Sequence, residues 1–164
     1  MLQLAVLASG LAIAVVTDVR TRRIPNWLTG SLAAAGFGMA FAGGGLTPWQ
    51  AALGLLTGLA LMMPAHVIGA TGAGDVKLMA AVGAVVGPGL TLRAFLFTAV
   101  AGGVFAVVVA ARRGRLADTL YGTTQLVTSP ATARRTIESS ERANRFAYGP
   151  AIAIGTLLSL MVTL

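Results

Sequence analysis

Apolar residues fill six segments of the chain, and short polar connections separate them. The segments cover about residues 2–17, 27–44, 49–68, 76–91, 92–111 and 146–164. A membrane-spanning helix needs roughly 17–25 predominantly apolar residues, so the first and fourth segments are short for a full span. Gly87-Pro88-Gly89 interrupts the fourth segment and predicts a tight turn after a short helix. The pattern therefore predicts an all-α membrane protein in which residues 1–164 form one domain, a bundle of about six transmembrane helices.

Composition agrees with this interpretation. Hydrophobic residues make up 56% of the 164 residues and charged residues only 10%, whereas a soluble protein carries roughly 25% charged residues. Met1-Leu2-Gln3 lacks the basic region that opens a cleavable signal peptide, so we expect the first segment to be retained as a membrane helix. The sequence has no cysteine, one histidine and five acids, and this set is unsuited to a structural zinc site. We expect no metal and no cofactor.

The basic residues predict the orientation. If the N-terminus lies outside, eleven of the twelve Lys and Arg residues fall in cytoplasmic connections and only Arg93 falls on the far side. This asymmetry follows the positive-inside rule. The net charge of +7 then serves topology and contacts with membrane lipids that carry anionic head groups. We expect no nucleic-acid partner, because aromatic residues do not alternate with the arginines.

Residues 112–145 form the longest hydrophilic segment. We interpret it as a long cytoplasmic loop. An interfacial helix is the alternative for its first part, because Leu116, Leu120 and Val127 could lie on one face.

One glycine-rich polar stretch separates two apolar segments, and it reads Gly69-Ala70-Thr71-Gly72-Ala73-Gly74-Asp75-Val76-Lys77-Leu78. Exposed amides and a carboxylate are costly at membrane depth, so an acid there is a candidate for a functional site. Asp18, at the end of the first apolar segment, is the one comparable acid. The predicted orientation places Asp18 and Asp75 at the cytoplasmic ends of their helices.

Two carboxylates that approach closely cannot both ionise cheaply, so one of them keeps a proton. Such a pair can polarise a water molecule and protonate a leaving amine, as in aspartic proteases. A free Asp titrates near pH 3.9, so keeping a proton near neutral pH requires raising its pKa by about 3, which burial and a like charge can supply. Lys77 would oppose this change, and we expect its side chain to point toward lipid head groups or substrate.

Simpler structural interpretations also exist for these residues. Asp75 could be the N-cap residue of the fourth helix, and Asp18 could pair with Arg22 at a helix end. Gly54-Leu55-Leu56-Thr57-Gly58 has the GxxxG spacing of closely packed helices. We expect His66 to be packed or hydrogen-bonded near the membrane interface.

Three blocks of the sequence, in order along the chain, are similar to motifs of one known family. Gly72-Ala73-Gly74-Asp75-Val76-Lys77-Leu78 matches the GxGD-x-K-L signature of the type IV prepilin peptidases, which are GxGD membrane aspartic proteases. Asp18, followed by Arg20-Thr21-Arg22-Arg23-Ile24-Pro25-Asn26, resembles the family's other catalytic block. Tyr148-Gly149-Pro150-Ala151-Ile152-Ala153-Ile154-Gly155 resembles the opening of its last helix.

This resemblance implies that Asp18 and Asp75 are the catalytic pair. It also implies cleavage of a short basic leader from prepilin or pseudopilin precursors, after a glycine, at the cytoplasmic face of the inner membrane. Six further residues receive roles from it: Gly72 and Gly74 in the active-site loop, and Lys77, Pro25, Asn26 and Tyr148 in binding substrate or lipid.

The chain also departs from the family pattern. Ala147 stands where the family often has proline. Bifunctional members carry a cytoplasmic domain, often with paired cysteines, and also methylate the new N-terminus. This chain has no cysteine and no room for such a domain before Asp18. It therefore resembles the small peptidase-only form associated with Tad/Flp-type pili, and we do not expect methyltransferase activity.

Two alternatives remain open at this point. Another GxGD protease, such as an archaellin-type leader peptidase, would differ in substrate and share the mechanism. A non-enzymatic membrane subunit of a pilus or secretion assembly, or a small proton-coupled carrier, would use the acids for structure or proton relay.

Overall fold

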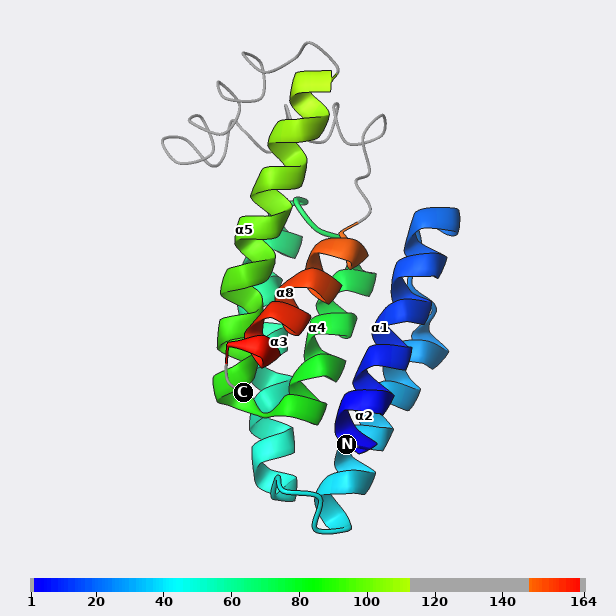
Figure 1. Ribbon diagram of the computed structural model, residues 1–164, viewed down its shortest axis with the longest axis vertical. Coiled ribbons are helices and arrows are strands. Elements are labelled where there is room, and N and C mark those ends of the chain that lie inside the picture. The colour runs from blue at the N-terminus through cyan, green and yellow to red at the C-terminus, as the bar shows by residue number, and fades with distance from the viewer. Residues whose placement is uncertain (1, 113–147, 163–164) are drawn as a thin grey trace.

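The computed structural model describes residues 2–112 and 148–162, and these residues form six α-helices. The helices are α1 (Leu2–Thr21), α2 (Asn26–Phe41), α3 (Pro48–Val67), α4 (Ala73–Val86), α5 (Pro88–Arg112) and α8 (Gly149–Met161). They run alternately up and down one bundle (Figure 1). We call the end that holds the α1–α2 and α3–α4 connections the upper end, and the end that holds the α2–α3 and α4–α5 connections the lower end. The all-α prediction is confirmed for the described residues.

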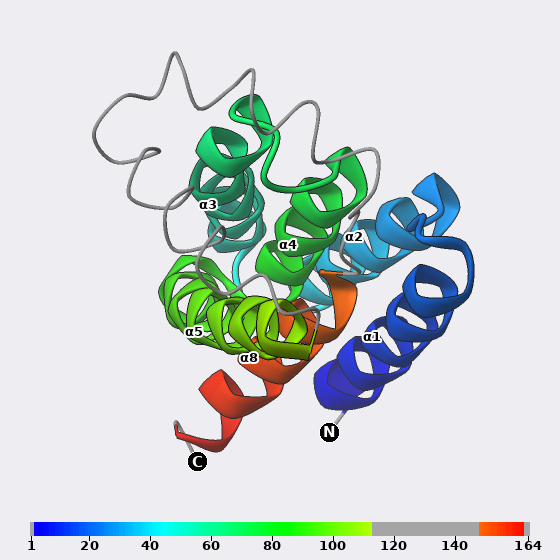
Figure 2. The ribbon, with the colours of Figure 1, turned by 90° about the horizontal axis from the view of Figure 1, so that it is seen from above.

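Helix α4 lies at the centre of the bundle, and the other helices surround it in the view along the bundle (Figure 2). It contacts every other described helix, and ten of its fourteen residues are buried. A helix enclosed on all sides needs apolar residues on all sides. The sequence from Leu78 to Val86 meets this requirement with nine consecutive residues that carry no polar side chain.

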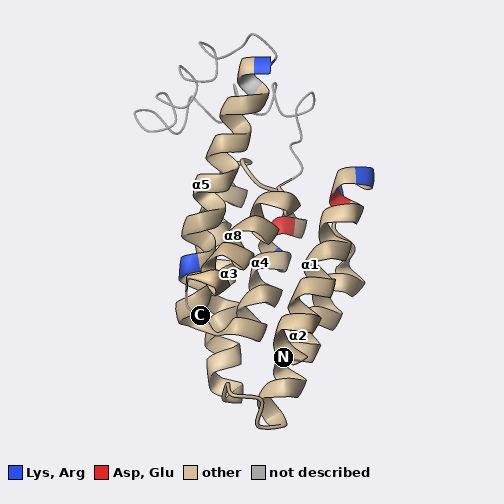
Figure 3. Ribbon diagram, viewed as in Figure 1, with Lys and Arg blue, Asp and Glu red and all other residues tan. Residues whose placement is uncertain are grey.

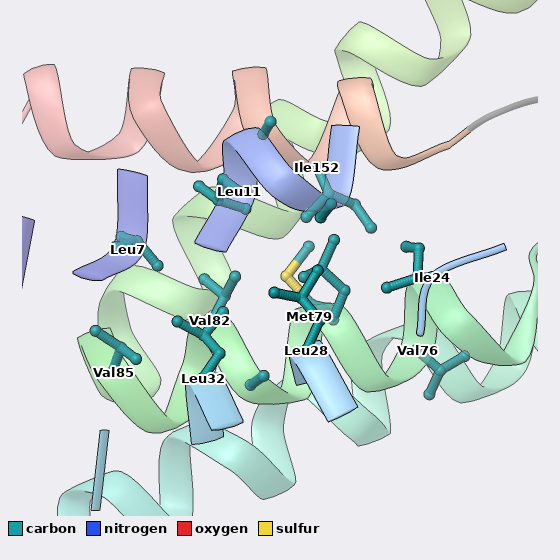
Figure 4. Close-up of a cluster of buried hydrophobic side chains, with 14 of the residues drawn as sticks. Leu7, Leu11, Ile24, Leu28, Leu32, Val76, Met79, Val82, Val85 and Ile152 are labelled. Atoms are coloured by element: carbon teal, nitrogen blue, oxygen red, sulfur yellow. The ribbon is translucent and has the colours of Figure 1, made fainter. Parts of the chain in front are cut away.

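The main hydrophobic core forms where three helices meet α4. Figure 4 shows side chains from α1, α2 and α8 converging on the side chains of α4. The labelled members are Leu7 and Leu11 of α1, Leu28 and Leu32 of α2, Ile152 of α8, Val76, Met79, Val82 and Val85 of α4, and Ile24 of the α1–α2 connection. Ile24 packs there beside the first turn of α4, so the core extends to the upper end of the bundle.

Glycines allow α2 and α3 to approach the backbone of α4 closely. A Cβ atom at Gly54 would overlap the carbonyl group of Gly83, and one at Gly58 would lie 2.7 Å from the carbonyl carbon of Met79. A Cβ atom at Gly36 would likewise meet the α4 backbone at 2.7 Å. Real Cβ atoms do not tolerate such contacts, so each of these positions needs glycine. The packing interpretation of the GxxxG pair in α3 is confirmed.

The first helix is longer than its apolar pattern predicts. We expected a segment ending near residue 17 and followed by a connection, but α1 continues to Thr21, so Asp18 lies inside the helix. The Arg22 backbone N–H donates to the Asp18 carbonyl, and Arg22 closes the helix with a φ of 51°. The connection therefore contains only residues 22–25, and α2 begins at Asn26. Charged side chains at exposed positions of the last turn do not stop a helix, and this explains the error.

The fourth helix is short, as predicted, but the turn after it is tighter. Gly87 alone, with a φ of 80°, separates α4 from α5. Pro88 then opens α5, where its missing N–H would have no partner in any case. Residues 87–91, predicted to belong to the fourth segment, therefore lie in the connection and in α5. At 1.5 Å per residue α4 is only about 21 Å long.

Three described helices are long and apolar enough to cross a membrane, namely Leu2–Thr21, Pro48–Val67 and Pro88–Val109. The other three, α2, α4 and α8, have 16, 14 and 13 residues. The predicted loop at 112–145 lies outside the described residues, except for Arg112 at the end of α5.

The contact between α3 and α4 generates a stability prediction. In Gly83→Ala the new methyl group would overlap Gly54, which should force the helices apart and destabilise the fold by about 1–3 kcal/mol. The midpoint of thermal unfolding in detergent should fall accordingly. Gly38→Ala is the matched control, because a Cβ atom at Gly38 in α2 meets nothing within 4 Å. Equal midpoints for the two variants would contradict the close contact of α3 with α4.

Candidate active site

Asp75 lies in the first turn of α4 and is only 7% exposed. Its Oδ2 accepts a hydrogen bond of 2.9 Å from the backbone N–H of Gly72. Gly72 has extended backbone angles and is the N-cap residue, so the interpretation of Asp75 as the N-cap is wrong. Asp75 is instead the third residue of the helix and reaches back to the cap, as an acidic residue does in a capping box.

The connection before α4 folds back onto the end of α3. Backbone N–H groups of Gly69 and Ala70 donate to carbonyl groups near the end of α3 at 2.9 and 2.8 Å, and Gly69 has a φ of 83°. The Nδ1 atom of His66 lies 3.0 Å from the Thr71 carbonyl oxygen and can donate to it as the Nδ1–H tautomer. Of the two predicted states of His66, packed or hydrogen-bonded, the structure shows the hydrogen bond. These bonds fix the path of the chain into Gly72.

Asp18 lies in the last turns of α1 and is 6% exposed. Its Oδ2 accepts a hydrogen bond of 2.7 Å from the backbone N–H of Gly149, the first residue of α8. The first N–H groups of a helix have no acceptor within that helix, so they are available for such a bond. The side-chain pairing that we considered with Arg22 is replaced by this bond, and Arg22 contacts Asp18 through the backbone.

The two acidic positions of the described residues lie toward the upper end, on α1 and α4 (Figure 3). Asp75 lies outside the three candidate spans. The pKa of its carboxyl is raised from 3.8 to about 6. Burial is the largest cause and the charge of Asp18 also raises this pKa, whereas the Gly72 hydrogen bond and His66 lower it. Burial, and then the charge of Asp75, also raise the pKa of the Tyr148 phenol. The structure thus brings Asp18, Asp75 and Tyr148 into one electrostatic environment.

The α1–α2 connection forms one side of this environment. A Cβ atom at Gly74 would lie 3.2 Å from Cβ of Ile24, so the connection rests directly on the first turn of α4. Gly74 belongs to that turn and not to a loop. The ammonium group of Lys77 donates to the side-chain oxygen of Asn26 at 2.9 Å and links α4 to α2 on the exposed surface. Pro25 precedes this link as the N-cap residue of α2.

The structure therefore places every predicted site residue at the upper end. Three contacts join this part of the bundle: Gly72 with Asp75, Gly149 with Asp18, and Lys77 with Asn26. Sequence reasoning did not assign a role to Gly149 or to His66, although both hold parts of this site. The Gly-Pro pair at 149 and 150 is a signal for a helix N-terminus with free N–H groups. Nothing in the sequence indicates that Asp18, 131 positions earlier, accepts from it.

Comparison with known proteins gives the family. The profile of the type IV leader peptidase family matches residues 5–107, more than half of the chain. The chain belongs to the type IV leader peptidase family. Membership makes this leader peptidase a hydrolase of peptide bonds, and its apolar helices are those of a membrane protein. The searches of curated proteins and of solved structures returned no significant match.

The effect of the Asp18 charge on the pKa of Asp75 in this leader peptidase predicts how Asp75 titrates. The infrared band of a protonated carboxyl from Asp75 should disappear as the pH rises through about 6. In Asp18→Asn the like charge is lost, so the same band should disappear at a lower pH. Asp75→Asn is the control that identifies the band. A titration of Asp75 near 3.8 in the unmodified protein would contradict its burial beside Asp18.

Proposed function

We propose that this leader peptidase is an aspartic endopeptidase in which Asp18 and Asp75 activate the attacking water. Its substrates are type IV or Flp-type prepilins, from which it removes a short basic leader by cleaving after a glycine. The proposal rests above all on one observation. The two acids within the described residues are both buried, both lie at the upper end, and the charge of one raises the pKa of the other.

The chemistry follows from a pair that shares one proton. The ionised carboxylate accepts a proton from the water molecule while the water oxygen attacks the scissile carbonyl carbon. The protonated carboxyl donates a hydrogen bond to the carbonyl oxygen, which takes up negative charge in the tetrahedral intermediate. Breakdown of the intermediate breaks the C–N bond and transfers a proton to the leaving amine. The products are the leader carboxylate and the mature N-terminal amine, so no cofactor is consumed.

Exposed side chains support a membrane position for the bundle. On α5, Leu92, Leu96, Val100 and Val104 are 47–66% exposed and recur every four residues, so they form one apolar stripe along the helix. An exposed stripe of this kind fits contact with lipid. We propose that the three long helices cross the bilayer, that the shorter α2 and α4 return the chain between them, and that α4 is enclosed by protein.

Charged and aromatic residues support the proposed orientation. Figure 3 shows basic positions at the upper ends of α1 and α5, and one lower on α5. We propose that the upper end lies on the cytoplasmic side of the inner membrane, as the positive-inside rule requires. Trp27 at the upper start of α2 and Trp49 at the lower start of α3 are both exposed, which suits anchors at the two interfaces.

We propose that Pro25, Asn26, Lys77 and Tyr148 form the rim through which the substrate or lipid head groups reach the aspartates. The exposed Lys77–Asn26 bond supports this role, because it holds the ammonium group at the surface. Peptidase-only activity of the Tad/Flp-associated type, without methylation of the new N-terminus, belongs to the same proposal.

The function is tested by co-expression with candidate pilins followed by N-terminal sequencing of the product. Asp18→Asn and Asp75→Asn should each lower turnover by at least about a thousandfold, and the double variant should be no worse than either single variant. The losses do not add because both carboxyl groups serve the same step. Purified enzyme in nanodiscs, assayed on a pilin that retains its leader, supplies the rates.

Two controls make the result specific. Each variant must still insert and unfold at a midpoint near that of the unmodified protein. Asp118→Asn makes the same chemical change at an acid of the long hydrophilic segment and should leave turnover unchanged. Near-normal turnover in either Asp18→Asn or Asp75→Asn would refute the two-aspartate mechanism, whereas loss of accumulation with retained cleavage would indicate a structural role.

Orientation can be tested by cysteine labelling, because the chain has no cysteine of its own. Thr21→Cys lies at the upper end and Ala42→Cys at the lower end, and both positions are exposed. In intact cells an impermeant thiol reagent should label position 42 and leave position 21 unlabelled. Permeabilised cells, in which both should react, are the control. Labelling of position 21 in intact cells would reverse the proposed orientation.

A further inference from the structure

The start of α8 meets Asp18 at unusually close range. The Gly149 N–H donates to Asp18 Oδ2, and an ideal Cβ atom at Gly149 would lie 2.8 Å from that oxygen and 3.1 Å from Cβ of Asp18. The group that would have to move to admit a side chain here is therefore the carboxylate itself. Only glycine allows the backbone N–H to approach the acid in this way.

A second glycine sets the position of the residue before Gly149. Tyr148 packs against the hydrophobic core, and its ring fits against α5 at Gly102. A Cβ atom at Gly102 would lie 2.6 Å from the phenol oxygen and 2.7 Å from Cε2 of this ring. Because the ring is held on one side by the core, a methyl group at position 102 would displace Tyr148, the immediate neighbour of Gly149.

We propose that Gly149 and Gly102 are positioning residues for Asp18. Gly102 leaves the space that the Tyr148 ring occupies, and Tyr148 fixes the first residue of α8. The Gly149 N–H then holds the Asp18 carboxylate in place. This inference rests on the proposed aspartic peptidase function. Neither glycine touches the substrate in this scheme, and both act through Asp18.

Two other glycines separate positioning from ordinary helix packing. Gly155 lies six residues further along α8, and a Cβ atom there would overlap the side chain and backbone of Thr98 in α5. It is needed for packing of α5 and α8, and the atoms nearest to its Cβ position belong to Thr98 and not to Asp18. Gly103 is adjacent to Gly102 in sequence, and a Cβ atom there meets nothing within 4 Å.

The test measures kcat, KM and the thermal midpoint for alanine variants at all four glycines. Gly149→Ala should lower kcat on the order of a hundredfold with little change in KM, since a displacement of about 1 Å at a reacting group can cost this much. Gly102→Ala should lower kcat roughly tenfold. Gly155→Ala should lower the thermal midpoint and leave kcat per folded molecule within a few-fold, and Gly103→Ala should change neither.

A double variant tests the route through Tyr148. If Gly102 acts by seating the ring, Gly102→Ala should add no further loss of kcat in a Tyr148→Ala background, where the clash is absent. The comparison of Gly102→Ala with and without the Tyr148→Ala change still tests the inference if Gly149→Ala does not fold.

Several outcomes would overturn the inference. They are a folded Gly149→Ala enzyme with unchanged kcat, an equal loss of kcat per folded molecule in Gly155→Ala, or the same loss for Gly102→Ala with and without the Tyr148 ring. Failure of the proposed function looks different, because Asp18→Asn or Asp75→Asn would then retain cleavage whatever the glycine variants do.

Discussion

The structure depends on the hydrogen bonds that allow an apolar helix bundle to bury two carboxylates. A buried carboxylate that loses its water must find donors in the protein, and here each acid takes a backbone N–H from the start of a helix. Gly72 at the start of α4 serves Asp75, and Gly149 at the start of α8 serves Asp18. The alternating direction of the helices makes this possible, because α4 and α8 both begin at the end where α1 finishes (Figure 1).

Close packing of α4 against its neighbours also helps to fix the position of Asp75. Gly54, Gly58 and Gly36 bring α3 and α2 against its backbone, so α4 is enclosed without bulky side chains on those faces. A helix held this tightly has little freedom to tilt or slide. Its first turn, which carries Asp75, is therefore fixed relative to the α1–α2 connection at Ile24. The glycines thus contribute to the geometry of the site although they lie outside it.

The sequence predicts the local part of this arrangement well. The six apolar segments, the break at Gly87 and the candidate pair of acids all follow from patterns within about 20 residues. The predicted end of α1 is wrong because a helix can continue through charged residues when they face outward. The alternative that Asp75 is an N-cap residue is wrong because the cap lies three residues earlier, at Gly72. The bond from Gly149 to Asp18 joins residues 131 apart. Only the packing of α8 between α1 and α5 creates it, and no local pattern encodes that packing.

The geometry also bears on the conflict between Lys77 and the proton that the proposed mechanism requires the aspartate pair to keep. Lys77 follows Asp75 by two residues, and on an α-helix this is a rotation of about 200°, so the two side chains leave on opposite sides. Asp75 is buried, whereas Lys77 is exposed and bonded to Asn26. The cation therefore lies at the exposed surface, where its field is screened. A lysine in this position is compatible with an aspartate whose pKa is raised by burial, and the helix period alone separates them.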